Sequence, residues 1–506
     1  MARKTTPSFI TEIPLKVDSK QERELLARFQ AGRQLVNACL NEALIRMNMV
    51  RNSEPYQKAK NISRNNLQQR KELFKLARHQ CRFTEYDLHS FATITAKSSK
   101  SIAKKVDSNT QQKIATRAFK AVERILLGRA SKIRFKVPSR FRSLEGKTNK
   151  QGIRWVNNQV TWCKLKLDAI IDWNNSVIAH GLNSPVKYCR VLWRMLNGKR
   201  RWYVQLVNEG LPYQKPHNYI TDGVVGIDLN ISNIAFVADN KSRLLPFADK
   251  LPTYEKEIAV LQRKMQRCQR ANNPDNYEPD FKKKVGNRVV TKKGFVKKGA
   301  KSWNNSNNYR KLRRQKSELQ RRKAAYAKTQ NRSVVNEILR HGNKIKAEKV
   351  SVKGWQKLYG KAIGAKSPGF VQSELKRKAE NAGGWFYQFS TRSTALSQTH
   401  LDGSKIKKSL SERVHKDVTG FEMHRDLFSA FLSRYVYDDL LSLQEAQSAY
   451  LGMESFLVEG WELYQTAKQV SASESRNSHN SSERFSTEVL ASNQIANKGD
   501  KLEGNA

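Results

Sequence analysis

The stretch "DGVVGIDLNISNIAFVADNKSRLLPF", residues 222–247, contains two apolar, β-rich segments joined by a turn. One carboxylate, Asp228, lies inside the first segment, between Ile227 and Leu229. Burying a charged side chain in an apolar strand is unfavourable unless another group pairs with it. The segment therefore predicts core strands, and it raises the question of what Asp228 faces.

The composition narrows the classes of protein and partner. The chain has 506 residues, of which 38% are apolar, enough for hydrophobic cores in several domains. Its 94 Lys and Arg against 45 Asp and Glu give a net charge of +49, which favours a polyanionic partner. We find neither an apolar run long enough to span a membrane nor a secretory signal. Five widely spaced cysteines without a C-x-x-C pair fit a reducing, cytoplasmic setting.

The first 215 residues combine helical and strand patterns. Ser19 and Glu22 are spaced as a capping box, and the apolar spacing that follows predicts helices to about residue 131. From residue 132 the period is that of strands, with turns predicted at Asn157-Asn158 and Asn197-Gly198. Aromatic residues interleave with arginines there; core packing explains most of the aromatics, and base stacking is the alternative. The arginines that we assign to nucleic-acid contact are Arg190, Arg194, Arg200 and Arg201.

A second basic region spans residues 281–330. It holds 18 Lys and Arg but a single acid, Glu318. Solvated charged helices usually mix both signs, so this bias favours contact with phosphates. The segment is expected to start as a loop and to become helical near Tyr309. The candidate contacts here are Lys283, Lys297, Lys298, Arg313, Arg314, Arg321 and Arg322.

Three acids lie at the ends of predicted elements. Asp228 is in a strand, Glu348 ends a short apolar alternation, and Asp426 begins a helix predicted to be amphipathic. Singly, each has a structural explanation: a satisfied strand carboxylate, a surface acid, and a charge on the helix dipole. Carboxylates that converge from separate elements can hold two Mg²⁺ ions about 4 Å apart, one of which activates water for phosphodiester cleavage.

The segments that carry these acids resemble the three RuvC motifs of the TnpB family of transposon-encoded RNA-guided nucleases and the related type V CRISPR effectors. They are "GIDLNISNIAFVADN" (226–240), "IKAEKVSVKGWQK" (345–357) and "HRDLFSAFL" (424–432). The segments between them, "KLRRQKSELQRRKAAY" followed by "VVNEILRHGN" and then 366–400, keep the order of that family. The resemblance covers about residues 130 to 435 and is looser over the N-terminal helices.

The resemblance implies an α+β multidomain protein. It implies a wedge-like β-barrel (1–18 and 132–215), an inserted α-helical recognition domain (19–131) and an RNase H-like (RuvC) α/β nuclease domain (216–393 and 423–440). Asp228, Glu348 and Asp426 would be its catalytic acids and would bind two Mg²⁺ ions. A guide RNA would supply specificity for target DNA, and the protein would read a short flanking motif. Residues 441–506 would form a C-terminal extension that is largely disordered from about 470.

Residues 394–422 depart from the family pattern. Relatives usually carry a zinc ribbon there, but no cysteine follows Cys268 in this chain. Its ligand positions are filled by residues such as Thr399, His400, Asp417 and Thr419. His400, His415 and His424 with Asp402 and Asp417 match no standard metal spacing, so we expect surface histidines and no zinc.

The leading functional hypothesis is an RNA-guided DNA endonuclease, because all three acids are retained. The lost ribbon keeps open an RNA-guided DNA-binding protein with weak or lost cleavage. A transposase acting in DNA strand transfer is a further alternative, although we find no helix-turn-helix or zinc finger for transposon ends. A structural RNA-binding protein would have no use for three such acids.

Overall fold

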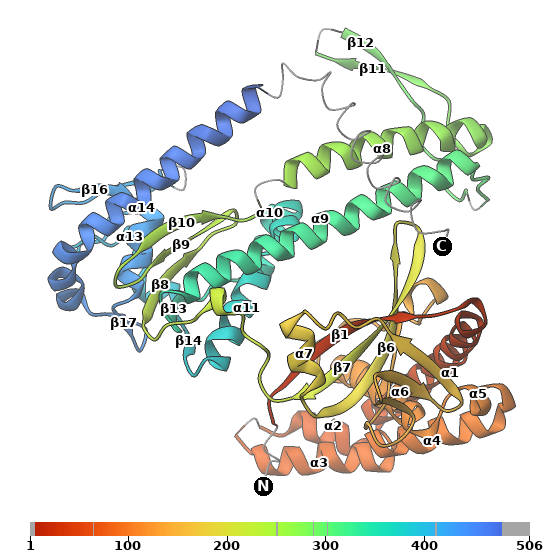
Figure 1. Ribbon diagram of the computed structural model, residues 1–506. Helices are drawn as coiled ribbons and strands as arrows, with labels where there is room; N and C mark the ends of the chain where they lie inside the picture. Colours follow the sequence, from red (N-terminus) through yellow and green to blue (C-terminus); the bar gives the residue numbers. More distant parts are fainter. Residues whose placement is uncertain are drawn as a thin grey trace, which may run out of the picture. The chain divides into compact units, whose positions relative to one another are not determined.

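The computed structural model describes residues 6–63, 65–248, 251–286, 288–300, 302–409 and 412–477. The protein is a mixed α+β chain of two compact units, residues 1–215 and 216–506, and each is described here by itself (Figure 1). None of the helices in the described residues is long and apolar enough to cross a membrane.

The first unit is built on a seven-stranded antiparallel sheet. Strand β1 (Ser8–Lys16) pairs with both β7 and β5, so the N-terminal strand lies among strands that come more than 140 residues later. The strand order is β2-β6-β7-β1-β5-β4-β3. Asn157, Asn158, Asn197 and Gly198 all have positive φ, as the two predicted two-residue turns require. The other strands are β2 (Ser143–Glu145), β3 (Ile153–Val156), β4 (Gln159–Trp162), β5 (Leu165–Ala169), β6 (Val186–Leu196) and β7 (Lys199–Glu209).

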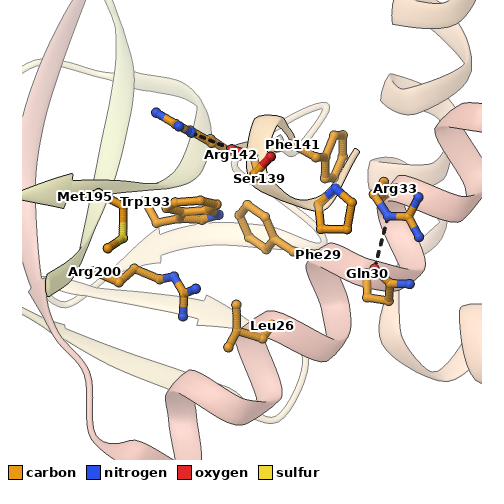
Figure 2. A pocket seen from close by; sticks show the side chains of 11 residues that line it. Leu26, Phe29, Gln30, Arg33, Ser139, Phe141, Arg142, Trp193, Met195 and Arg200 are labelled. Atoms are coloured by element: carbon orange, nitrogen blue, oxygen red, sulfur yellow. Dashed lines mark hydrogen bonds between the residues drawn. The ribbon is translucent and has the colours of Figure 1, made fainter. Parts of the chain in front are cut away.

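Six helices follow β1 and share one core with the sheet. The capping box of α1 (Ser19–Asn52) is one residue earlier than predicted, because Asp18 is extended and its carboxylate accepts the N–H of Gln21 at 2.7 Å. The Gln21 side chain accepts the N–H of Asp18 in return, at 3.0 Å. The remaining helices are α2 (Glu54–Asn61), α3 (Leu67–Gln80), α4 (Glu85–Ser98), α5 (Lys100–Lys105), α6 (Ser108–Leu126) and, beyond β5, α7 (Ser176–Leu182). A cavity opens between α1 and β6 (Figure 2).

The second unit is built on a five-stranded mixed sheet, in the order β10-β9-β8-β13-β14. Strands β10 (Ser242–Pro246), β9 (Asn233–Val237) and β8 (Val224–Leu229) are antiparallel neighbours and include the opening sequence. Strands β13 (Lys344–Glu348) and β14 (Trp385–Phe389) continue the sheet parallel to β8. Strand β8 is therefore the point where pairing changes from antiparallel to parallel.

Helices cover both faces of this sheet. Alternate residues such as Val225, Ile227 and Ile345 pack against α9 (Asn307–Leu339) and α11 (Pro368–Asn381). The opposite face, with Ala235 and Val237, packs against α13 (Arg425–Ser433) and α14 (Leu443–Asn477). The helix predicted to begin at Asp426 is α13, and every one of its residues is buried, so its polar residues as well as its apolar ones are covered by the rest of the protein.

Three further segments complete the second unit. The predicted loop at the start of the basic region is in fact a hairpin of β11 (Phe281–Val285) and β12 (Arg288–Lys292), because the two strands pair in continuous register. Helices α8 (Leu251–Asn272), α10 (Val352–Lys366) and α12 (Thr391–Thr394), and the hairpins β15–β16 (Val414–Lys416, Glu422–His424) and β17–β18 (Val436–Tyr437, Leu440–Leu441), fill the connections. Helix α14 continues to Asn477, and residues 478–506, which make up most of the segment expected to be disordered from about residue 470, lie outside the described chain.

Candidate active site

Asp228 and Glu348 lie at the carboxyl ends of two neighbouring parallel strands. The register pairs Lys346 with Gly226 and Ala347 with Ile227, so the next step along both strands brings Glu348 beside Asp228. Both carboxylates belong to the sheet face that turns towards α13, and both side chains are half-buried. The carboxyl ends of parallel strands where a sheet changes direction are common ligand sites.

Asp426 reaches the same place from the first turn of α13. The helix lies so close to β8 at Gly226 that a β-carbon there would be 2.1 Å from the backbone oxygen of Ala430. Asp426 is one helical turn before Ala430, and Asp228 is two residues after Gly226 on the same face, so α13, which runs antiparallel to β8, brings Asp426 near enough for its charge to act on Asp228. The ring of His424 caps the helix by accepting the N–H of Asp426 at 3.2 Å. Asp426 is only 2% exposed.

The electrostatics of Asp228 and Glu348 reflect this crowding. Burial raises the pKa of Asp228 well above its usual range, and the charges of Asp426 and Glu348 raise it further. Arg425 and Arg413 act in the opposite direction on the same group. Burial raises the pKa of Glu348 to about 7. Such shifts are typical of carboxylates gathered for function, since like charges in a poorly solvated site oppose ionisation.

The carboxylates have the chemistry of a hard-cation site. Oδ2 of Asp426 is buried without a hydrogen-bond partner among the described residues, while Oδ1 lies 3.7 Å from Arg413 and 3.8 Å from Arg425. A buried carboxylate oxygen without a donor is unfavourable unless a cation or water contacts it. Because Mg²⁺ takes oxygen ligands and keeps several waters, the half-open edge beside Asp228 and Glu348 fits it.

Lys346 is a site residue that the sequence pattern did not identify. It is 5% exposed and lies two residues before Glu348 on the same face of β13. Its ammonium group donates to the backbone oxygen of Arg434 at 2.7 Å and lies 3.5 Å from the centre of the Tyr437 ring. Burial lowers the pKa of Lys346 to about 8. The signal in the sequence was weak, because a lysine that alternates with Ile345 and Ala347 is also the pattern of a solvent-facing position.

The four predicted arginines of the first unit lie on β6 and β7, and three of them already have acidic partners. Arg190 pairs with Glu145 at 2.7 Å and Arg200 with Glu22 at 2.9 Å. Arg194 pairs with Glu12 of β1. Arg201 is exposed. These ion pairs hold the sheet and α1 together, so the cationic surface of this hairpin is smaller than the sequence alone indicates.

The predicted contacts of the second unit are all exposed. Lys283 lies on β11, and Lys297 and Lys298 follow β12. On α9, Arg321 and Arg322 share Glu318, the single acid of the region, at 2.5 and 3.2 Å. Arg313 and Arg314 lie two turns earlier on the same helix. The surface is available for phosphates, but it lies on the hairpin and on the early turns of α9, away from the three acids in the sequence.

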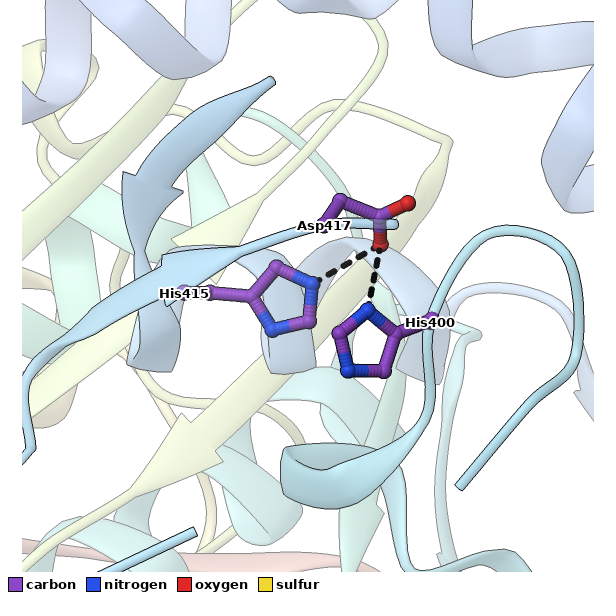
Figure 3. A group of neighbouring side chains, drawn as sticks. All are labelled: His400, His415 and Asp417. Carbon is purple, nitrogen blue, oxygen red and sulfur yellow. Dashed lines mark hydrogen bonds and ion pairs between the residues drawn. The ribbon is translucent and has the colours of Figure 1, made fainter. Parts of the chain in front are cut away.

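The insert between β14 and α13 contains a buried polar cluster. His400, His415 and Asp417 have ligand atoms that all lie within 4.8 Å of one another, and no other such group occurs in the part of the chain described (Figure 3). His400 and His415 are 2% and 0% exposed, and His424 is 6% exposed, so the expectation of surface histidines is wrong. Asp402 lies outside the cluster, and its carboxylate accepts a hydrogen bond from the backbone N–H of Ser404. The rings pack in an aromatic core, with His415 4.3 Å from the Phe428 ring.

The hydrogen bonds of this cluster do not fit zinc. His415 Nε2 lies 2.9 Å from Oδ2 of Asp417, and His415 Nδ1 lies 2.5 Å from the ammonium group of Lys408. Because an ammonium group only donates, Nδ1 accepts and Nε2–H donates to Asp417. Asp417 also accepts the N–H of Leu401, and the N–H and hydroxyl of Thr419. The carboxylate of Asp417 and both ring nitrogens of His415 therefore already have hydrogen-bond partners. Lys408 supplies the positive charge that a metal ion would otherwise bring.

The other two expected ligand positions agree with this interpretation. Nδ1 of His400 accepts the N–H of Val418 at 3.1 Å, which leaves only its buried Nε2 without a partner. The hydroxyl of Thr399 donates to backbone oxygens of Thr394 and Ala395. One available nitrogen is not enough for a tetrahedral zinc site.

The same insert contacts the acids. The N–H of Arg425 donates to the backbone oxygen of Arg413, and the Arg425 guanidinium donates to the backbone oxygen of Ser409, each at 2.9 Å. Arg413, which is also within 3.7 Å of Asp426, therefore links the insert to the N-terminus of α13. The insert is thus hydrogen-bonded to the start of α13, next to Asp426.

Comparison with known proteins gives similarity of structure but not of sequence. No protein-family model and no curated protein matches the chain. A solved structure described as "Cryo-EM structure of the Cas12f1-sgRNA-target DNA complex" matches with a TM-score of 0.43 and 10% identity, over 85% of this chain and 98% of that chain. A second, "Cryo-EM structure of CRISPR-Cas12f Ternary Complex", matches with a TM-score of 0.29 and 11% identity, over 81% of each chain. Both TM-scores are below 0.5 and both identities are near 10%, so these similarities assign no activity to this chain.

Proposed function

We propose that this protein is an RNA-guided DNA endonuclease whose site is formed by Asp228, Glu348 and Asp426. The observation that carries the proposal is that the charges of Glu348, from β13, and of Asp426, from α13, act on Asp228 of β8, with the pKa of Asp228 and that of Glu348 both raised. Placing three acids in one poorly solvated site lowers the stability of the fold. A function that needs these acids would account for that cost. The resemblance of their segments to RuvC motifs supports the same role.

The residues would divide the work of phosphodiester cleavage. Bound Mg²⁺ supplies water activation and stabilisation of the leaving oxygen. Asp426 presents its unpartnered Oδ2, and Asp228 and Glu348 give up protons when they become ligands. Lys346 lies two residues before Glu348 on β13. It would help to position the helix that carries Asp426, because its ammonium group donates a hydrogen bond to the backbone oxygen of Arg434 at the C-terminus of α13.

A guide RNA and a target DNA are the proposed partners. The net charge of +49 and the exposed cations of β11, the segment after β12, and α9 support binding of long polyanions. Within this proposal, the sheet of residues 1–18 and 132–215 is the wedge-like domain, the helices of 19–131 are the recognition domain, and residues 216–393 with 423–440 are the RuvC-like nuclease domain.

A second candidate is RNA-guided DNA binding without efficient cleavage. Arg413 and Arg425 already place positive charge within 4 Å of Asp426. These guanidinium groups compete with a divalent cation for the same carboxylate. The insert that supplies Arg413 is also the part of the chain without cysteine ligands.

The experiment starts with purification from the native host and sequencing of the RNA that copurifies. A DNA target complementary to a defined RNA is then incubated with wild type, Asp228→Asn and Asp222→Asn, with and without Mg²⁺. Asp222 is an exposed acid that forms an ion pair with Lys344, so it is a matched control. Mg²⁺-dependent cleavage by wild type and Asp222→Asn but not Asp228→Asn supports the proposal. Guided binding without cleavage selects the second candidate, and joined donor and target strands would indicate a transposase.

A further inference from the structure

The first unit contains a cavity that the proposed active site does not use. It has a volume of about 450 Å³ and lies between α1, the segment 138–142 and the strand β6. Its size falls within the range of about 300–1,000 Å³ that is common for small-molecule sites. Figure 2 shows the rings of Phe29 and Trp193 side by side in the middle of this cavity, with Met195 at one side. The floor is therefore apolar and largely aromatic.

The polar groups around this floor are cationic. The described residues that line the cavity include three arginines and no acid. The guanidinium of Arg142 lies 5.2 Å from the centre of the Trp193 ring, and that of Arg200 lies 4.9 Å from it (Figure 2). The third arginine, Arg33, lies at the opposite end of the cavity and donates a hydrogen bond to the side chain of Gln30. A ligand in this cavity would contact aromatic carbon and guanidinium nitrogen together.

One nitrogen atom of these arginines is buried without a hydrogen-bond partner among the described residues. Nε of Arg200 is buried and has none among the described residues, although Nη1 pairs with Glu22. Arg142 is exposed. Of its guanidinium nitrogens, only Nε has a hydrogen-bond partner among the described residues, the backbone oxygen of Ser139. Buried donors are rarely left unpaired in folded proteins, so an acceptor oxygen from a ligand would complete this site.

We propose that this cavity binds one unpaired nucleotide of a nucleic-acid strand. Its base would lie against the apolar floor formed by Phe29, Trp193 and Met195, and its phosphate would accept hydrogen bonds from Arg142 and Arg200. Flat aromatic bases with an anionic phosphate match this combination of surfaces, and the absence of acids among the lining residues suits an anion. The inference rests on the proposed function only in its choice of partner, and it does not require cleavage.

The first test measures the contribution of a base. RNA-free full-length protein is titrated with a short labelled single strand and with the same strand made abasic, in enough salt to suppress non-specific phosphate binding. The ratio of the two affinities is compared between wild type, Arg142→Gln and Met195→Ser. Arg140→Gln and Ile10→Ser are the matched controls, since both residues are exposed in the same unit and lie outside the cavity.

We expect wild type and both controls to prefer the strand with bases by at least about fivefold. We expect Met195→Ser to lose most of this preference, and Arg142→Gln, which removes a phosphate contact, to bind both strands more weakly than wild type and Arg140→Gln do. Equal ratios in all five proteins would overturn the inference. Decanoate that competes with the strand better than a mononucleotide does would also overturn it, because the cavity would then hold an aliphatic anion.

The second test locates the nucleotide. Strands that carry 4-thiouridine in RNA or 4-thiothymidine in DNA are photocrosslinked, and the modified peptides are identified by mass spectrometry. Crosslinks in residues 26–33 or 193–200 support the site and show which strand occupies it, whereas crosslinks only elsewhere contradict it. Asp228→Asn should crosslink as wild type does, so a failure of the proposed nuclease and a failure of this cavity are distinguishable.

Discussion

Gly226 of β8 and Ala430 of α13 are in direct backbone contact. A β-carbon on Gly226 would lie 2.1 Å from the Ala430 oxygen and 2.4 Å from Oγ of Ser433. This approach brings the first turn of α13, with Asp426, onto the strand that carries Asp228. The absence of a side chain at one position thus determines whether two of the three acids meet.

Gly226→Ala is therefore expected to impair the site while leaving the first unit intact. The added methyl group must displace α13, which costs about 1–3 kcal/mol of unfolding free energy and separates Asp426 from Asp228. Guided cleavage should be lost, whereas RNA binding should remain. Gly452→Ala is the control, because a β-carbon there meets nothing within 4 Å in α14. Full cleavage by Gly226→Ala would show that the close contact is not required.

The three acids are expected to act as one unit. Asp228→Ala, Glu348→Ala and Asp426→Ala should each lower the rate of Mg²⁺-dependent cleavage by orders of magnitude, because loss of one carboxylate weakens the cation site. A double variant should be little slower than either single one, since groups that act together are not additive. Binding of RNA and target, measured by gel shift, should stay nearly unchanged. Multiplicative losses in the double variants would contradict a shared site.

The cluster of His400, His415 and Asp417 is expected to be held by Lys408 and to contain no zinc. Metal analysis of dialysed protein tests the second point directly. Lys408→Met should lower the unfolding free energy by about 1–3 kcal/mol, because the buried Nδ1 of His415 loses its donor. Lys407→Met is the control, since Lys407 is exposed. One zinc ion per chain, or equal stability of the two variants, would refute this interpretation.

The same cluster predicts loss of stability in mild acid. The pKa of His415 is lowered to about 4, mainly by burial and also by the charges of Lys408 and His400, while the hydrogen bond to Asp417 opposes these effects. Because the folded protein takes up this proton less readily than the unfolded chain does, the stabilisation is complete above the ordinary pKa of about 6.5 and is lost as the pH falls towards 4.

The difference between these pKa values corresponds to at most about 3 kcal/mol. Urea unfolding between pH 7.5 and 4.5 should show a steeper loss in wild type than in His415→Gln. The exposed His79 provides the control variant, His79→Gln, which should follow wild type. Parallel curves for wild type and His415→Gln would exclude this origin.

The packing of α14 determines how far the chain can be shortened at its C-terminus before it fails to fold. Tyr450, Met453 and Leu457 of α14 are 5%, 6% and 0% exposed in the core that contains α13. A chain ending after residue 477 should fold and bind RNA as the full chain does. A chain ending after residue 442 should lose this apolar cover over α13 and aggregate, as light scattering would detect. A soluble, active protein of the shorter length would show that α14 is dispensable.

The sequence by itself determined the local features of this protein. The strand character of 222–247, the two asparagine-containing turns, the helices after residue 19 and the carboxylates at element ends follow from short-range patterns, because turn chemistry and side-chain period act over a few residues. The net charge also predicts a polyanionic partner, and this prediction does not depend on knowing the fold.

Tertiary structure decided what these features contact. The burial of His400 and His415, the face of β13 that carries Lys346, and the pairing of Arg190, Arg194 and Arg200 with acids depend on segments that are distant in the chain. The pattern of α13 predicted an amphipathic helix but not its surroundings, and in the structure the sheet and α14 bury all of its residues. A periodic pattern specifies which residues share a face, but only packing determines whether that face meets water, another helix or a charged site.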